Sequence, residues 1–174
     1  MALSGLVMIA LTASAGSTGA TFTATTANPG SQFVSATLTM STDKPNAGDL
    51  VNVTSLVPGD TAQRVVHVTN TGNVGFTYAA SSSASANTLL WSDTTNGLQA
   101  DVYRCNNCTT TSLRIYTGAL KNLSLPASGT IAAAGGEYLT FVFTLPTTAG
   151  NTFQGLSQDF TISYTATQLA GAAR

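Results

Sequence analysis

Alternating apolar and polar residues run through much of this chain and restrict its fold more than any other feature of the sequence. Every second residue is apolar in residues 34–40, 139–145 and 160–166. A period of two places the apolar side chains on one face of a β-strand and the polar ones on the other. Shorter stretches with the same pattern lie at residues 64–69, 74–80, 98–104 and 113–117. The sequence therefore predicts half-buried strands.

Turn residues separate these predicted strands, among them Pro29-Gly30, Pro58-Gly59, Asn96-Gly97 and Gly135-Gly136. Short strands divided by such turns are typical of an antiparallel sandwich, so we expect an all-β domain over residues 31–174. We also expect one short helical turn near residues 88–92, and a loop or solvated strand end at residues 81–86. The length of 174 residues fits one such domain.

Particular side chains are expected to shape the turns. Pro58 presets φ for the first turn position, Gly59 accepts a positive φ at the second, and Asp60 caps the turn through its carboxylate. Asp93 is expected to cap in the same way. The segment from Asn70 to Asn73 offers left-handed positions between two strands.

The first 42 residues contain no charged side chain. Residues 1–15 form an apolar, leader-like run that is shorter than the roughly 20 residues a membrane span needs. A small threonine-rich strand follows, with Ala20, Phe22, Ala24 and Thr26 on one face. This segment, within residues 1–30, is either the first strand of its own sheet or a donor strand for the sheet of a partner. Both alternatives remain open at this point.

The low charge content limits the kinds of partner that the protein is expected to bind. Charged residues make up 7% of the chain and the formal net charge is −1, against about 25% charged residues in an average soluble domain. There is thus no electrostatic basis for binding nucleic acid or an anionic lipid surface. Near-zero net charge favours association between copies.

The residues that could carry chemistry are few. Cys105 and Cys108 are the two cysteines, and in an exported protein such a pair forms a local disulfide. His67, the one histidine, lies opposite the Val66/Val68 face of its strand, and one histidine cannot make a zinc site with so few other ligands. No G-x-S-x-G motif is present. We therefore expect no catalytic residue, no metal and no cofactor. Trp91 and Phe153 are expected to be packing residues.

Three sequons, at Asn52, Asn107 and Asn122, are candidates for glycosylation, and Asn107 is expected to be the most exposed. Glycans would help to hydrate a surface that carries so little charge.

Four stretches of the chain, taken in order, resemble a known family. They are residues 33–39 (FVSATLT), residues 56–73 with Pro58-Gly59-Asp60 ahead of Asn70, residues 91–98 (WSDTTNGL), and residues 145–155 (LPTTAGNTFQG). This combination is similar to the TasA/camelysin family of secreted filament-forming proteins, including its archaeal bundling-pilus relatives, and it spans nearly the whole chain.

The resemblance implies a jelly-roll-like sandwich that polymerises by giving its N-terminal strand to the next subunit. The expected function is that of a structural subunit of an extracellular filament or pilus, in a biofilm matrix or at a cell surface. Its partners would be its own copies and other matrix or surface components, with no membrane span in the mature form. The acceptor is expected to be an apolar groove between the sheets, built from Leu139, Phe141, Phe143, Phe160, Ile162 and Tyr164.

Two other functions remain open at this point. The first is a monomeric secreted sandwich that serves in adhesion or carbohydrate binding. The second is a pilin with a helical N-terminal stalk, which the β-branched threonines after residue 20 disfavour.

Overall fold

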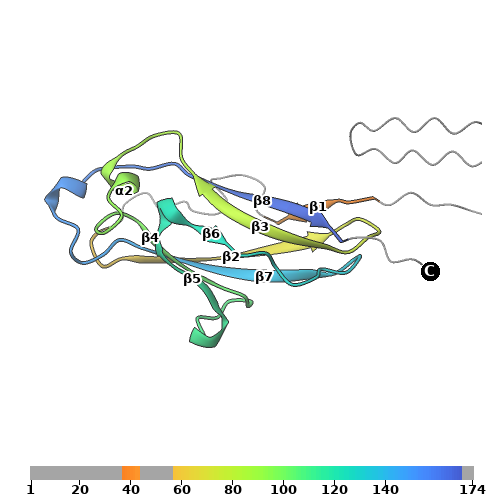
Figure 1. Ribbon diagram of the computed structural model, residues 1–174. Coiled ribbons are helices and arrows are strands. Elements are labelled where there is room, and N and C mark those ends of the chain that lie inside the picture. The colour runs from red at the N-terminus through yellow and green to blue at the C-terminus, as the bar shows by residue number, and fades with distance from the viewer. Residues whose placement is uncertain (1–36, 44–56, 170–174) are drawn as a thin grey trace, which may run out of the picture. The chain divides into compact units, whose positions relative to one another are not determined.

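The computed structural model describes residues 37–43 and 57–169, all within one compact unit, Ser35–Arg174. These residues form two antiparallel sheets that pack face to face (Figure 1). The larger sheet has the order β1-β2-β7-β4-β5 and the smaller one the order β6-β3-β8. The prediction of an all-β antiparallel sandwich is therefore confirmed. The predicted donor residues Ala20, Phe22, Ala24 and Thr26 lie outside the described residues.

The strands follow the alternating stretches of the sequence closely. Their bounds are β1 Met40–Thr42, β2 Thr61–Asn70, β3 Phe76–Ser83, β4 Gln99–Tyr103, β5 Arg114–Ala119, β6 Ser124–Leu125, β7 Gly136–Thr144 and β8 Thr161–Gln168. A one-turn helix, α2 (Leu89–Ser92), stands where a helical turn was expected, and 3-10 turns occupy Thr111–Leu113, Leu120–Asn122 and Asn151–Phe153. β1 and β2 pair, as do β4 and β5, and each other connection between consecutive strands crosses between the sheets.

The core is made by the inward faces of both sheets. β7 lies at the centre of the larger sheet, and its side chains Leu139, Phe141 and Phe143 are fully buried. Phe143 contacts Phe160, just before β8, with ring centroids 5.4 Å apart. Trp91 and Phe153 are buried at the α2 end of the core, which confirms them as packing residues.

Two turns behave as the sequence predicted. Gly59 has a φ of +96°, and the Asp60 carboxylate accepts the Val57 N–H at 3.0 Å. Asp93 accepts the N–H groups of Thr95 and Asn96, both at 2.9 Å. The backbone N–H groups of Asn96 and Thr95 lower the pKa of the Asp93 carboxyl because they stabilise its charged form.

The prediction for residues 70–73 was wrong in its mechanism. None of these residues has a positive φ. Asn70 is instead fully buried, and its amide donates to the Val74 carbonyl at 2.8 Å and the Ile131 carbonyl at 3.0 Å, while its oxygen accepts the Gly72 N–H at 2.9 Å. A side-chain amide thus joins the β2–β3 connection to the segment before β7. The glycine is required by close approach, since a Cβ at Gly72 would lie 2.2 Å from the Thr37 carbonyl oxygen.

The predicted disulfide is present between Cys105 and Cys108, in the β4–β5 connection. The loop that it closes packs against the larger sheet, because Thr140 donates to the Cys105 carbonyl at 2.8 Å and Gln63 donates to Asn107 at 2.8 Å. On the same sheet His67 stacks on Tyr138 with ring centroids 4.1 Å apart. His67 therefore occupies an outward strand position, as expected.

Replacing Asn70 with alanine should lower the free energy of unfolding by about 2–4 kcal/mol, because the Val74 and Ile131 carbonyls each lose a hydrogen bond and the Gly72 N–H loses its acceptor. Urea denaturation followed by circular dichroism measures this change. The control is Asn122→Ala, at an exposed position, which should alter stability by no more than about 0.5 kcal/mol. Equal effects of the two substitutions would contradict the role given to Asn70.

Candidate functional site: an open sheet edge

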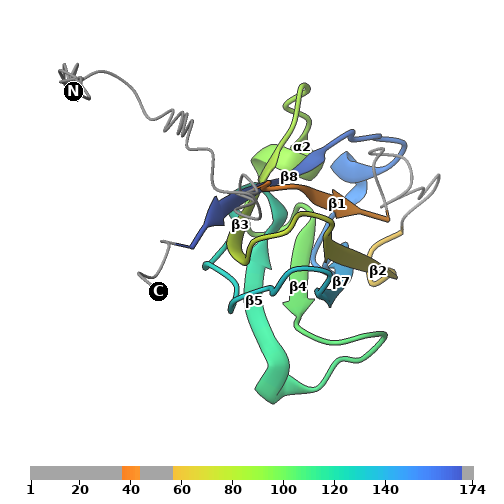
Figure 2. The same ribbon diagram turned by 90° about the vertical axis from the view of Figure 1, so that its right-hand side faces the viewer.

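Among the strands that the structure describes, β8 has the longest uncovered edge. Its eight residues pair in register with β3, from Thr161 opposite Ser83 to Gln168 opposite Phe76. Among the described residues no second strand pairs with β8. One side of this strand therefore presents a row of backbone N–H and C=O groups that a further strand could use. Figures 1 and 2 show β8 at the border of the smaller sheet, with β1 on the same side of the sandwich.

The inward face of β8 is less well covered than that of its neighbour. Ile162, Tyr164 and Ala166 point toward the core and are half-buried. On β3 the inward residues Phe76, Tyr78 and Ala80 are buried. The difference in burial agrees with the sheet order, in which β8 has a described neighbour on one side alone. An added strand would bury these side chains further and so gain hydrophobic free energy.

β8 also lacks the devices that usually protect an edge. Its sequence, TISYTATQ, contains no charged residue and no proline, and its register with β3 is continuous. The other edge strands differ. β1 and β6 have three and two residues, and β5 carries Arg114 together with Gly118 at a φ of +140°. β8 is thus the long unprotected edge in the described part of the chain.

Tyr164 is the polar group nearest the core at this edge. Its hydroxyl oxygen is buried and has no hydrogen-bond partner among the described residues. Burial raises the pKa of the Tyr164 hydroxyl, and the Asp43 carboxylate raises it further. Asp43 follows β1 and is held in place by the His67 N–H, which donates to it at 2.7 Å. The charge of Asp43 therefore lies between the border strands of the two sheets.

The structure places the six predicted acceptor residues in two different environments. Leu139, Phe141 and Phe143 are at most 1% exposed in the centre of the larger sheet, and Phe160 is also buried. Ile162 and Tyr164 lie on the open edge strand. A docking strand could therefore contact the last two directly, whereas the β7 side chains form the floor of the closed core. Sequence reasoning did not place Met40 and Ala166 at this site, although both pack against the core from the border strands.

Two of the three sequons fall within the described residues. Asn107 and Asn122 are both exposed, and Asn107 has a φ of +53°. They flank β5 on the side of the sheets away from β8. Asn52 lies outside the described residues.

The described residues show no sign of a metal site or of a membrane-spanning helix. Within residues 37–43 and 57–169 there is no group of three or more metal-ligating side chains, and no helix there is long and apolar enough to cross a membrane. The chain matches no protein-family model and no curated protein. The open edge of β8 is therefore the described feature that best indicates a function.

Tyr164→Phe should raise the free energy of unfolding by about 1 kcal/mol at neutral pH, because it removes a buried hydroxyl without a partner. It should also reduce the loss of stability at high pH. Because the folded-state pKa of Tyr164 is raised, its ionisation does not change stability below the ordinary value of 10.0, where both states are protonated. As the pH rises from there toward the folded-state pKa, the unfolded chain loses this proton first, and stability falls.

Denaturant titrations at pH 7 and pH 11 measure both effects. Tyr138→Phe, at an exposed tyrosine that keeps its ring against His67, is the matched control and should change neither. A Tyr164→Phe protein that is less stable than the parent would mean that the hydroxyl has a partner.

Proposed function

We propose that this chain is a structural subunit of an extracellular filament or pilus that assembles by donor-strand complementation. The observation that carries the proposal is the eight-residue edge strand β8, which has one pairing partner among the described residues and a half-buried inward face. A strand donated by a second copy would complete the hydrogen-bond ladder, and its alternate side chains would cover Ile162 and Tyr164.

The proposed donor lies within residues 1–30, with Ala20, Phe22, Ala24 and Thr26 as the face that enters the sandwich. Its alternation matches that of β8, and neither segment carries a charge. Docking would therefore bury no ionised side chain from either strand. The acceptor is the β8 edge with Ile162, Tyr164 and Ala166, together with Met40 from β1. Of the six acceptor residues expected from the sequence, this set keeps Ile162 and Tyr164.

The surface chemistry supports self-association over binding of a charged partner. Seven acidic residues and six Lys or Arg residues leave a net charge of −1, so copies repel one another weakly. The disulfide between Cys105 and Cys108 is typical of an oxidising compartment. A role in a biofilm matrix or at the cell surface, as in the TasA/camelysin family that the sequence resembles, is part of the proposal.

Ile162→Lys should abolish filament formation while the subunit stays folded. At the edge of a single subunit the lysine can extend its ammonium into water. Beneath a donated strand that charge would be buried without a partner, at a cost of several kcal/mol. Electron microscopy and sedimentation measure assembly, and circular dichroism measures folding.

The control for this variant is Ser163→Lys, one residue along on the exposed face of β8, which should assemble normally. Filaments of Ile162→Lys that are as abundant as those of the parent would contradict the acceptor assignment. A parent protein that stays monodisperse would favour a monomeric adhesion or carbohydrate-binding module instead.

Phe22→Asp tests the donor side of the same contact. An aspartate at this position would bring an unpaired charge into the apolar space between the sheets, so assembly should fail. Thr23→Asp places the same charge on the opposite face of the donor and should be tolerated. Mixing Phe22→Asp with Ile162→Lys subunits gives a further check. The first keeps a normal acceptor and the second a normal donor, so the two should pair as dimers that grow no further.

A further inference from the structure

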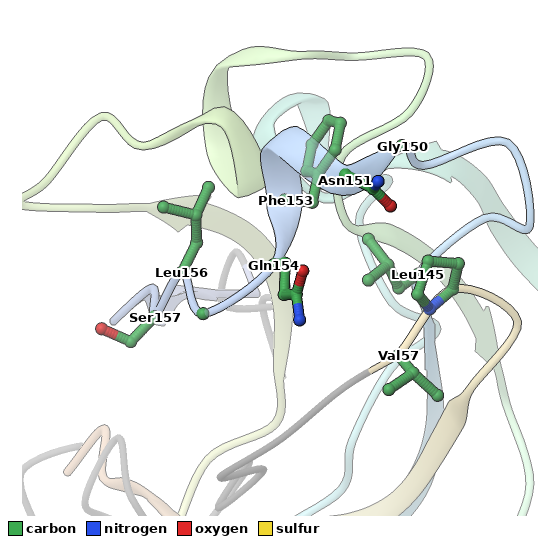
Figure 3. A pocket seen from close by; sticks show the side chains of 10 residues that line it. Val57, Leu145, Gly150, Asn151, Phe153, Gln154, Leu156 and Ser157 are labelled. Carbon is green, nitrogen blue, oxygen red and sulfur yellow. The ribbon is translucent and has the colours of Figure 1, made fainter.

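A pocket opens at the end of the sandwich where β2 and β8 begin and β7 ends (Figure 3). It has a volume of about 450 Å³, and Val57, Pro58, Leu145, Phe153 and Leu156 supply its apolar walls. Val57 and Leu156 are 59% and 38% exposed at its mouth. None of the described residues that line it is charged. Such a space suits a large uncharged side chain rather than an ion or a charged ligand.

The N-terminal segment joins the sandwich at the opposite end. Thr37 donates its N–H to the Asn73 side chain at 2.6 Å, and the Asn73 N–H donates to the Thr37 carbonyl at 3.0 Å. Asn73 lies in the β2–β3 connection. The ten residues of β2 separate this connection from the pocket, which corresponds to about 30 Å. Thr37, the first described residue, therefore lies at the end of the sandwich that is remote from the pocket.

These two positions determine how one copy can meet the next. When copies stack end to end, the segment leaving one copy reaches the pocket end of its neighbour before it reaches the rest of the β8 edge. Continuing along that edge, the donor strand would run antiparallel to β8, because β8 begins at the pocket end. An antiparallel addition agrees with the pairing in the rest of the smaller sheet.

We propose that this pocket is the socket for Phe33 of the neighbouring copy. Phe33 is the largest apolar side chain between residues 27 and 36, and it lies four residues before Thr37. Four extended residues span at most about 13 Å. Phe33 can therefore lie no further than this from Thr37 of its own copy. The inference rests on the proposed filament and adds its polarity and a second contact.

Cysteine pairing between copies tests the contact. Phe33→Cys and Leu156→Cys are made in separate full-length proteins, mixed as unassembled subunits and oxidised after assembly. A disulfide joining residue 33 of one copy to residue 156 of the other is expected, identified by mass spectrometry. Leu169→Cys replaces Leu156→Cys in the control; this leucine is equally exposed, at 40%, but lies at the other end of the sandwich, after β8. It should not pair.

The energetic contribution is measured by the critical concentration for assembly. Phe33→Ala should raise it by roughly a hundredfold, as expected for loss of a buried aromatic anchor, and Leu156→Lys should do the same, whereas Leu169→Lys should leave it unchanged. Filaments that form normally without the cross-link, at unchanged critical concentration, would overturn the socket and leave the filament proposal standing. A cross-link seen only when both cysteines are on one chain would place Phe33 in its own pocket and also overturn it. Absence of filaments from the parent protein would defeat the filament proposal itself.

Discussion

The pairing of β3 with β8 is the interaction on which the rest of this structure depends. It holds the last strand in register along its full length and leaves the other side of that strand without a described neighbour. Among the described residues the smaller sheet has three strands and faces a sheet of five. The inward β7 side chains are fully buried between the two sheets, but β8 has a described neighbour on one side alone. The half-buried state of Ile162 and Tyr164 agrees with this edge position.

Uncharged polar groups make several of the contacts that join segments distant in the sequence. Asn70 joins the β2–β3 connection to Ile131, and Ser128 accepts the Tyr78 N–H at 2.8 Å. Inside, the Tyr78 hydroxyl donates to Glu137, which Arg104 approaches at 3.7 Å. Amides and hydroxyls therefore supply most of these contacts, and one ion pair, Arg104 with Glu137, adds to them. The Thr37 backbone is held by two hydrogen bonds to Asn73, which is also uncharged.

Much of the fold could be predicted from the sequence because a period of two is a local property. The pattern in residues 139–145 corresponds to β7, and that in residues 160–166 to β8, within a few residues at each end. The pattern does not predict the order of the strands in the sheets. Leu139 and Ile162 belong to equally regular patterns, yet one lies in a central strand and the other at an edge. Their difference in burial depends on long-range pairing, so the predicted acceptor groove combined residues from two environments.

The role of Asn70 was missed for a related reason. An asparagine near a glycine between two strands indicates a turn, and local chemistry suggests a left-handed backbone. Its actual contacts reach Ile131, which is distant in sequence. A buried amide that joins two segments cannot be distinguished from a turn former until both segments are placed.

A donor and an acceptor that lie on one chain, but at different ends of it, have a consequence for assembly. In the proposed filament each copy would offer one N-terminal segment and one β8 edge, so the contact would be heterologous, with different surfaces meeting on the two partners. Heterologous contacts give rings when the rotation closes and open helical filaments when it does not. With the N-terminal segment leaving at Thr37 and β8 beginning at the far end, successive copies point in the same direction. The positions of Thr37 and of the β8 edge therefore favour a polar, unbranched filament.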